Sequence, residues 1–399
     1  MKDKKIIVGV TGGIAAYKAA ELVRILVKAG AETRVAMTAN ATKFITPLTL
    51  EALSGNRVVW DMFDPGTHPI AHITWGQESD LVIIAPATAN FIAKIANGIA
   101  DDFLSTMVLA STAKILVCPA MNSQMYINPV TKENLKRVVE KGYMVLEPGE
   151  GKLACNSEGL GRLTDPQEIA EQALVMLTEQ DLSGLRVLVT AGPTIEPMDP
   201  VRYISNRSTG KMGYAIARAA SMRGASVTLI SGPTELSPPH GLKFHGVKSA
   251  EEMKEAVFSC LADSDVIIKA AAVSDYRPRE ISGQKIKKGS DSLSLDLVKN
   301  PDILAELGKT KADAAYILVG FAAETEDLLT NAKQKLRDKN LDIIIINDVT
   351  REDAGFEADT NLVKIIHRDG HREDLPLMSK DDVANHILDR IKELRENGI

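Results

Sequence analysis

The first half of the chain alternates between short apolar runs and longer stretches whose apolar residues recur at helical spacing. Apolar runs predict strands at residues 5–10, 33–38, 81–85, 114–119 and 143–146. A helix is predicted from residue 14 to about 29, with Gly30 in the usual position after its end. Continuous apolar runs suit parallel strands that are covered on both faces. The alternation of strand and helix therefore predicts a doubly wound parallel sheet.

The pattern restarts after a polar stretch at residues 179–184. Strands are predicted at residues 186–190, 226–230, 265–271, 316–321 and 342–346. Helices are predicted at 213–223 and 379–396, a hairpin at 362–375 around Asp369-Gly370, and a mobile loop at 277–292. We place the domain boundary near Ser183. The sequence thus predicts two Rossmann-like α/β domains with mainly parallel sheets, residues 1–182 with a flavodoxin-like fold and residues 183–399.

Composition narrows the class of protein. The 399 residues are 45% hydrophobic and 25% charged, with a net charge of -6 and only 4% aromatic residues. These values argue against binding to nucleic acid or to an anionic membrane surface. No run approaches the roughly 20 apolar residues of a membrane span. Three widely spaced cysteines form neither a zinc pattern nor a disulfide framework, which favours a cytoplasmic protein.

Three segments of the first half follow strands at the edge of the sheet where ligands bind. Gly12-Gly13 lies between a strand and a helix, a geometry that suits a phosphate group. The dinucleotide pattern G-x-G-x-x-G is absent, which favours a mononucleotide. About half of such turns are simply tight connections, so the turn alone does not decide. Residues 86–90 (PATAN) and 119–122 (PAMN) follow the third and fourth strands.

These segments, together with residues 11–18 (TGGIAAYK), resemble the FMN-dependent cysteine decarboxylases, and in particular the 4′-phosphopantothenoylcysteine decarboxylases. The resemblance covers nearly the whole first half. It implies that FMN oxidises the cysteinyl thiol of the substrate, so that carbon dioxide can leave before the product is reduced and protonated. The implied FMN contacts are Gly12, Gly13, Ile14, Thr38, Pro86, Ala87, Thr88, Ser105 and Thr106.

The same resemblance implies three catalytic residues. His72 matches the active-site histidine, and Asn122 matches the asparagine that holds the substrate carboxylate. Cys155 matches a proton donor on a flap over the substrate, although Asn156 follows it where many relatives have glycine. From the residues alone, a lone histidine is more often structural and an asparagine after a strand is a turn residue. We interpret Cys118 and Cys260, which lie in apolar segments, as buried packing residues.

A long loop follows the first strand of the second half. Residues 191–206 (AGPTIEPMDPVRYISN) lead into 207–213 (RSTGKMG), where a Ser/Thr/Gly run enters a helix. Such runs bind anions through backbone N–H groups, although the Walker pattern is absent. From the pattern alone, an ordinary loop is an equally good interpretation.

This loop and residues 265–276, 285–288, 299–304 and 319–324 resemble the phosphopantothenate–cysteine ligases. The resemblance implies that the carboxylate of 4′-phosphopantothenate attacks the α-phosphate of CTP. An acyl-cytidylate and pyrophosphate form, and the amine of cysteine then displaces CMP. Asn206 would polarise the acyl carbonyl and Lys285 would cover the α-phosphate. The implied nucleotide contacts are Lys269, Ala270, Ala271, Asp275, Lys285, Pro301, Asp302, Ile303, Leu304, Phe321, Lys335 and Lys339.

Several expectations accompany these resemblances. Lys269 would contact CTP through its strand end, with an incidental side chain, and Mg²⁺ would accompany the triphosphate, with ligands that the sequence does not identify. The family likeness implies a homo-oligomer with trimers of the flavin domain and dimers of the ligase domain. The alternatives are a flavin-binding regulatory protein of the same fold, which His72, Asn122 and Cys155 together disfavour, and a nicotinamide-dependent reductase.

Overall fold

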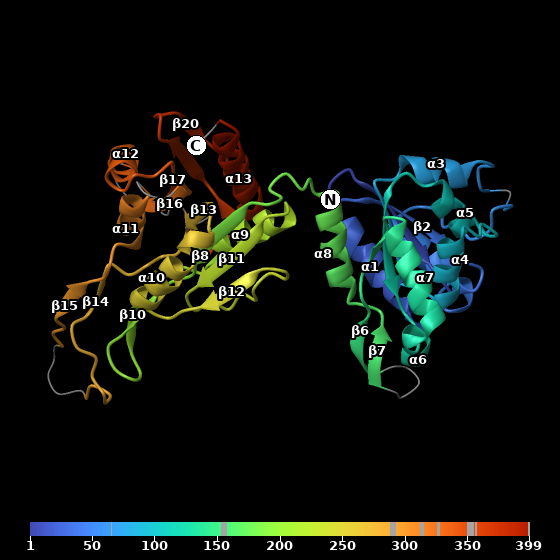
Figure 1. The fold of residues 1–399 in the computed structure, drawn as a ribbon, viewed down its shortest axis with the longest axis horizontal. Helices are drawn as coiled ribbons and strands as arrows, with labels where there is room; N and C mark the ends of the chain where they lie inside the picture. Colours follow the sequence, from blue (N-terminus) through green and yellow to red (C-terminus); the bar gives the residue numbers. More distant parts are fainter. Residues whose placement is uncertain are drawn as a thin grey trace. The chain divides into compact units, whose positions relative to one another are not determined.

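The computed structural model describes residues 1–64, 66–152, 158–287, 293–311, 315–324, 328–348, 355 and 357–397. Contacts divide the chain into two compact units, Met1–Glu179 and Gln180–Ile399. The division falls close to Ser183, where the pattern of the sequence restarts. Each unit is a sheet covered by helices, and the order of the elements along the chain can be followed by colour in Figure 1.

The first unit contains a five-stranded parallel sheet in the order β2-β1-β3-β4-β5, which is the flavodoxin order. The strands of the first unit are β1 (Lys5–Val10), β2 (Glu32–Met37), β3 (Leu81–Ala87), β4 (Lys114–Pro119), β5 (Met144–Val145) and the antiparallel pair β6 (Gly149–Lys152) and β7 (Glu158–Arg162). Its helices are η1 (Ile14–Tyr17), α1 (Lys18–Lys28), η2 (Ala41–Lys43), α2 (Pro47–Ser54), α3 (Ala71–Glu78), α4 (Ala89–Asn97), α5 (Phe103–Ala110), α6 (Ser123–Ile127), α7 (Pro129–Glu140) and α8 (Pro166–Leu177).

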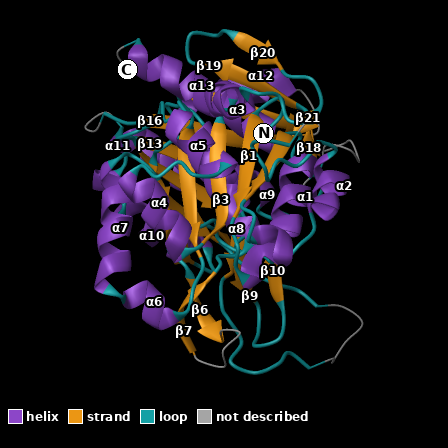
Figure 2. Cartoon of the chain, turned by 90° about the vertical axis from the view of Figure 1, so that its right-hand side faces the viewer, coloured by secondary structure: helices purple, strands orange, loops and turns teal. Residues whose placement is uncertain are grey.

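Both faces of this sheet are buried, as the continuous apolar runs predict. Ile6 and Val8 of β1 pack with residues of α1 and α8, whereas Ile7 packs with α4 and α5 on the other face. Each strand residue therefore meets a helix on whichever side it points. Figure 2 shows the strands between layers of helices.

The second unit contains an eight-stranded sheet in the order β12-β11-β8-β13-β16-β17-β19-β20. The first six of these strands are parallel and follow the order of a dinucleotide-binding Rossmann fold, and β19 and β20 extend the sheet antiparallel. The strands of the second unit are β8 (Arg186–Ala191), β9 (Ile195–Pro197), β10 (Tyr203–Ser205), β11 (Ser226–Ser231), β12 (Lys243–Gly246), β13 (Val266–Lys269), β14 (Tyr276–Pro278), β15 (Leu297–Lys299), β16 (Ile317–Glu324), β17 (Ile343–Asp348), β18 (Thr360–Asn361), β19 (Val363–His367), β20 (Arg372–Asp374) and β21 (Met378–Ser379). Its helices are α9 (Lys211–Met222), α10 (Ala250–Ser259), η3 (Leu261–Asp263), α11 (Ile303–Thr310), α12 (Leu328–Asp338) and α13 (Lys380–Glu396).

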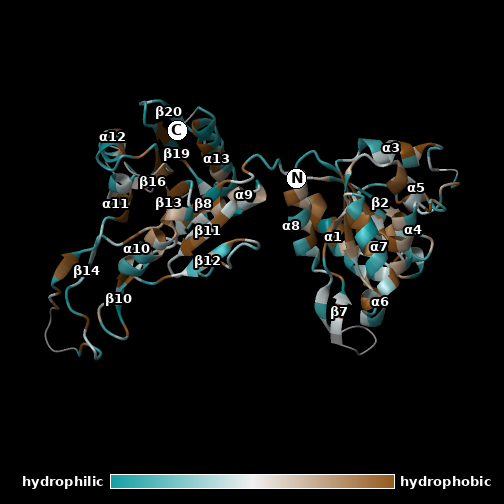
Figure 3. Ribbon diagram, viewed as in Figure 1, coloured by the Kyte–Doolittle hydropathy of each residue, from teal (hydrophilic) through white to brown (hydrophobic). Residues whose placement is uncertain are grey.

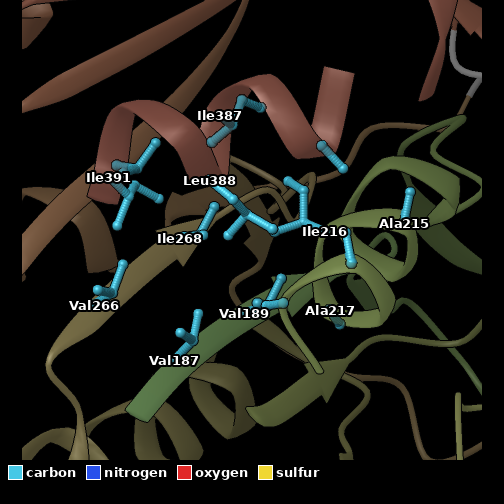
Figure 4. Close-up of a cluster of buried hydrophobic side chains, with 14 of the residues drawn as sticks. Val187, Val189, Ala215, Ile216, Ala217, Val266, Ile268, Ile387, Leu388 and Ile391 are labelled. Atoms are coloured by element: carbon cyan, nitrogen blue, oxygen red, sulfur yellow. The ribbon is translucent and has the colours of Figure 1, made fainter. Parts of the chain in front are cut away.

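Two helices cover one face of the second sheet, and three cover the other. In Figure 4, Ile387 and Leu388 of α13 and Ile216 of α9 lie over Val189 and Ile268 of β8 and β13. Helices α10, α11 and α12 supply the core on the opposite face. The hydrophobic colour in Figure 3 gathers on the elements that form these cores, while the connecting loops are mainly hydrophilic.

The structure confirms most of the predicted elements and corrects several. Strands 5–10 and 114–119 and the hairpin around Asp369-Gly370 form as predicted. The first helix is not continuous from residue 14, because a 3₁₀ turn precedes α1, and the helix predicted at 213–223 begins earlier, at Lys211. Cys118 is buried as expected, but Cys260 ends α10 in a half-buried position. None of the helices described in the structure is long and apolar enough to cross a membrane.

Candidate functional site

Each parallel sheet has one place where the strand order reverses, and ligands of such folds bind there, outside the carboxyl ends of the strands. In the first unit, β1 and β3 flank this place. In the second unit, β8 and β13 flank it. Residues 11–13, 86–90, 191–206 and 270–276 follow these four strands, so the topology brings these candidate residues to one edge of each sheet.

In the first crevice, the buried Thr11 side chain joins the ends of β1 and β3. Its hydroxyl donates to the carbonyl oxygen of Pro86 at 2.7 Å and accepts from the backbone N–H of Thr88 at 3.0 Å. Thr88 in turn begins α4, where its hydroxyl accepts from the backbone N–H of Phe91. The Thr11 hydroxyl is therefore occupied within the protein, and it fixes the two loops that would hold a ligand.

Gly12 allows close contact between two loops at this edge. A Cβ atom on Gly12 would lie 2.5 Å from Cβ of Asn40, whereas one on Gly13 would lie 3.4 Å from the nearest side-chain atom, in Thr88. Thr38, at the end of β2, has a buried hydroxyl without a hydrogen-bond partner among the described residues. A narrow glycine cradle and an unpaired hydroxyl fit the phosphate and polar groups of a mononucleotide such as FMN.

Two other predicted FMN contacts, Ser105 and Thr106, lie at the start of α5. Leu104 beside them lies against Gly9 of β1, which places this turn over the sheet. The Ser105 hydroxyl forms a capping box with Asp102, and the Thr106 hydroxyl donates to the carbonyl oxygen of Asp102 at 2.7 Å. Both hydroxyls thus stabilise the helix start, and a contact from either to FMN stays a prediction.

Asn122 lies where β4 ends and α6 begins, beside the β6–β7 hairpin. The backbone N–H of Ala120 donates to Ala87, which joins the end of β4 to β3. The N–H of Met121 donates to Gly161 of β7 at 3.0 Å, so the hairpin lies against the segment that carries Asn122. Residues 153–157, which join the two strands and include Cys155 and Asn156, lie outside the described residues. A flap over the substrate stays a prediction.

His72 belongs to α3, which packs against α5 through Gly76. Its Nδ1 atom is buried and has no hydrogen-bond partner within the described part of the chain. No hydrogen bond joins His72 to Gly12 or Thr88 among the described residues. The other cysteine of this unit does not suit proton transfer, because complete burial raises the pKa of the Cys118 thiol well above its usual range.

In the second crevice, Asn206 reaches the strand next to β8. Its Nδ2 donates to the carbonyl oxygen of Ala272, just beyond β13, at 2.9 Å. The buried Thr194 side chain accepts from the backbone N–H of Ser274 at 3.0 Å and fixes the same segment. Asn206 itself is exposed, so its amide is held at the carboxyl edge of the sheet and faces solvent.

Three predicted nucleotide contacts gather on the α11 side of the sheet. Asp302 begins α11, where its carboxylate accepts from the backbone of Ala305 and forms an ion pair with Lys339 at 2.8 Å. Lys269 is buried beside them. Desolvation lowers the pKa of Lys269 to about 8, an effect that the nearby Asp302 and Asp275 carboxylates partly oppose. The Lys269 side chain therefore belongs to this charged cluster, and its contact with a nucleotide stays a prediction.

The loop that carries Lys285 is anchored on both sides of that residue. The backbone N–H of Ser282 donates to Met198, and the N–H of Ile286 donates to the carboxylate of Asp199 at 3.1 Å. Arg202 donates to the carbonyl oxygen of Ile286 at 2.7 Å. Lys285 projects as an exposed residue from this anchored stretch, while residues 288–292 lie outside the description.

Sequence reasoning missed one group of polar residues at this edge. Asn347 lies in β17, Asn361 lies in β18 and Lys380 begins α13, and all three line a cleft with the start of α9. Burial lowers the pKa of Lys380 to about 8. These residues come from separate segments without a common motif, so only the fold reveals that they face one space.

Comparisons with known proteins agree with this arrangement. Residues 1–177 match the flavoprotein family, and residues 182–394 match the DNA/pantothenate metabolism flavoprotein C-terminal domain. The coenzyme A biosynthesis bifunctional protein CoaBC of Bacillus subtilis is 48% identical over 399 residues, covering 99% of this chain and 98% of that protein. The protein of the same name from Escherichia coli is 46% identical over 98% of this chain and 97% of its own length. The chain belongs to the coenzyme A biosynthesis bifunctional proteins.

A crystal structure of the C-terminal domain of a CoaBC protein shares 42% sequence identity and covers 55% of this chain and 100% of its own, with a TM-score of 0.48. Membership of the CoaBC family rests on the full-length relatives. As a member of this family, the chain is a bifunctional enzyme of coenzyme A biosynthesis. Its first half is the flavoprotein domain with decarboxylase activity, and its second half is the domain with ligase activity.

Proposed function

We propose that the second half joins 4′-phosphopantothenate to cysteine with CTP, and that the first half decarboxylates the product, 4′-phosphopantothenoylcysteine, to 4′-phosphopantetheine with FMN. One observation carries this proposal. In each unit, residues that match the family lie at the carboxyl edge of the sheet, beside the place where the strand order reverses. Thr11, Gly12 and Thr88 meet in the first crevice. Asn206 and the Lys269–Asp302–Lys339 cluster lie at the edge of the second.

In the ligase half, cations must stabilise a triphosphate while an acyl-cytidylate and pyrophosphate form. Lys285, on its anchored loop, would contact the α-phosphate. Asn206 would donate to the acyl carbonyl oxygen, since its amide is already held next to Ala272. The base and ribose would lie on the α11 side, with contacts from the nucleotide set predicted above. Mg²⁺ would accompany the triphosphate.

In the decarboxylase half, the Gly12-Gly13 turn, Thr38 and the Pro86–Thr88 segment would hold FMN. Bound FMN supplies a two-electron oxidant that makes loss of carbon dioxide from the cysteinyl carboxylate feasible. Asn122 would orient that carboxylate from the start of α6. The hairpin that lies against Met121 would exclude water from the substrate, and Cys155, in the segment of the sequence between its two strands, would deliver a proton to the product.

We also propose an assembly in which flavin domains form trimers and ligase domains form dimers, within the cytoplasm. Large apolar side chains of the first unit support this, since Ile14 is 63% exposed and Leu48 is 71% exposed. In the second unit, Tyr203 of β10 and Tyr276 of β14 are exposed on neighbouring two-stranded ribbons. Where such side chains form a contiguous patch, they mark a contact with another chain.

Two measurements on the purified protein test the proposed chemistry. The nucleotide released by the ligase should be CMP, and its release should require both 4′-phosphopantothenate and cysteine. The flavin released on denaturation should be FMN. Release of AMP or ADP from ATP, with no use of CTP, would overturn the nucleotide assignment. A colourless protein that does not regain flavin when incubated with FMN would overturn the decarboxylase mechanism.

A further inference from the structure

One buried carboxylate joins two loops of the second unit. Asp199 lies in the turn between β9 and β10, and its side chain is 0% exposed. Its Oδ1 atom accepts from the backbone N–H groups of Val201 and Arg202, both at 2.8 Å. Its Oδ2 atom accepts from the backbone N–H of Ile286 at 3.1 Å. Burial of a carboxylate is costly unless hydrogen bonds satisfy it, so these three donors hold Asp199 in place.

The three hydrogen bonds of Asp199 differ in what they connect. Two of them come from its own turn, whereas Ile286 is 87 residues away along the chain. Arg202 strengthens this long-range contact, because its Nη2 atom donates to the carbonyl oxygen of Ile286 at 2.7 Å. The Nε atom of Arg202 also lies 3.7 Å from the carboxylate of Asp199. Both polar backbone groups of Ile286 are therefore bound by one turn.

This turn is the anchor of the loop that follows β14. Among the described residues 280–287, every hydrogen bond to another segment ends within residues 198–202. One of these bonds runs from the backbone N–H of Ser282 to the carbonyl oxygen of Met198, at 3.0 Å. Lys285 lies between the anchored positions, and its own side chain is exposed. The backbone of Lys285 is thus placed by contacts that do not use its ammonium group.

Asn206, which directly follows β10, belongs to the same hairpin but has a separate anchor. Its side chain donates to the carbonyl oxygen of Ala272 at 2.9 Å, beyond the end of β13. The carboxylate of Asp199 takes no part in that bond. Loss of the bond between Asp199 and Ile286 should therefore displace Lys285 and leave the Asn206 amide in place.

We propose that Asp199 is a positioning residue for the first half-reaction of the ligase, in which it holds the Ile286 peptide so that Lys285 reaches the α-phosphate of CTP. This assignment rests on the proposed function. A carboxylate oxygen of 4′-phosphopantothenate forms a bond to the α-phosphorus, the bond to the bridging oxygen breaks, and its electron pair leaves with pyrophosphate. Lys285 stabilises the negative charge on the phosphate oxygens. Because its backbone is already fixed, less conformational freedom is lost when it binds.

Two substitutions and their combination, made in the full chain, test this role. Asp199→Asn keeps an oxygen for the donors of its own turn but presents an N–H group to that of Ile286, so the long-range bond is lost. Lys285→Gln removes the ammonium group. Glu280→Gln, at an exposed position of the same loop, removes one negative charge as Asp199→Asn does, and is the matched control. Pyrophosphate release from CTP and 4′-phosphopantothenate is measured without cysteine, at saturating substrate.

Asp199→Asn should slow pyrophosphate release about tenfold, as expected for the loss of a hydrogen bond to a charged group. In the Lys285→Gln background, the same substitution should change the rate by less than about twofold, because a residue that acts through Lys285 has no further effect once the ammonium is gone. Glu280→Gln should leave the rate unchanged. Decarboxylation of 4′-phosphopantothenoylcysteine by the first unit should be equal in all variants.

An unchanged rate of pyrophosphate release in Asp199→Asn overturns the proposal. So does a double variant in which the two losses multiply, since Asp199 would then act by a route other than Lys285. If Asp199→Asn does not fold, Ile286→Pro removes the donor of the same bond from an exposed loop and gives the same test. Failure of the unaltered protein to release pyrophosphate from CTP overturns the proposed function itself, and the two failures are therefore distinguishable.

Discussion

Substitution of Gly12 by alanine should separate two loops that carry the flavin site. The new Cβ would lie 2.5 Å from Cβ of Asn40 and 2.9 Å from its backbone carbon, where ordinary contact begins near 3.4 Å. The loops must therefore move apart by about 0.9 Å, because neither Asn40 atom can rotate away. Overpacking of this kind costs about 1–3 kcal/mol in the free energy of unfolding.

Gly13→Ala is a matched control in the same turn. Its Cβ would meet only Thr88 Cγ2, at 3.4 Å, and its φ of -149° suits any residue. Alanine there should leave the free energy of unfolding unchanged or raise it by up to about 1 kcal/mol, since it restricts the unfolded chain. The two variants differ by one methyl group each, so the contrast isolates the contact with Asn40.

Tryptophan fluorescence during urea unfolding of the flavin-free protein measures this contrast. Both tryptophans of the chain, Trp60 and Trp75, belong to the first unit, so the signal reports on that unit alone. Titration with FMN should then show affinity weakened about tenfold or more in Gly12→Ala, as the 1–3 kcal/mol distortion reaches the turn. Equal stability of the two variants would refute the close approach at Gly12.

Three further predictions concern single side chains. Cys155→Ser should still release carbon dioxide from 4′-phosphopantothenoylcysteine but form little 4′-phosphopantetheine, as judged by product mass, and normal product formation would exclude a proton-donor role. Lys285→Gln should slow pyrophosphate release in rapid-quench assays by about tenfold or more, and an unchanged rate would exclude contact with the α-phosphate. The Asp181 carboxylate is nine-tenths buried, and hydrogen bonds from Arg223, and next from Lys392, lower its pKa to about 2. Because the pKa in the unfolded chain is near 4, the ionised carboxylate stabilises the fold above that pH. This stabilisation is lost as the pH falls toward 2. Asp181→Asn should lower stability at pH 7 by about 3 kcal/mol and flatten its acid dependence in circular dichroism, and an unchanged pH profile would contradict the pair's role.

The central strands were predictable because each is a continuous apolar run between two covered faces. Residues 5–10 form β1 and residues 114–119 form β4, as predicted, and every residue after the first is buried in both. Strand β12 has no such signature, since all of its side chains are exposed at the edge of the parallel strands. The β6–β7 hairpin is rich in glycine and pairs only locally, so periodicity did not indicate it.

The candidate site residues also fall into two groups, those that the sequence predicts and those that only the fold reveals. Gly12, Thr88 and Asn122 lie directly after strands, and the rule for the carboxyl edge of parallel sheets brings them together from the sequence alone. Asn347 belongs to β17, the last of the parallel strands, and Asn361 to the two-residue strand β18, and their shared cleft depends on how β18 and α13 pack. The sequence held no signal for the burial of Lys269 beside Asp302, because burial is a property of the packed chain.

The most direct test of two activities in one chain supplies the purified protein with 4′-phosphopantothenate, cysteine and CTP and follows all products by mass spectrometry. The account predicts 4′-phosphopantetheine, with CMP and carbon dioxide formed in equal amounts. Omission of CTP should abolish all three products. Accumulation of 4′-phosphopantothenoylcysteine without carbon dioxide in a protein that contains FMN, or formation of carbon dioxide without CMP, would contradict it.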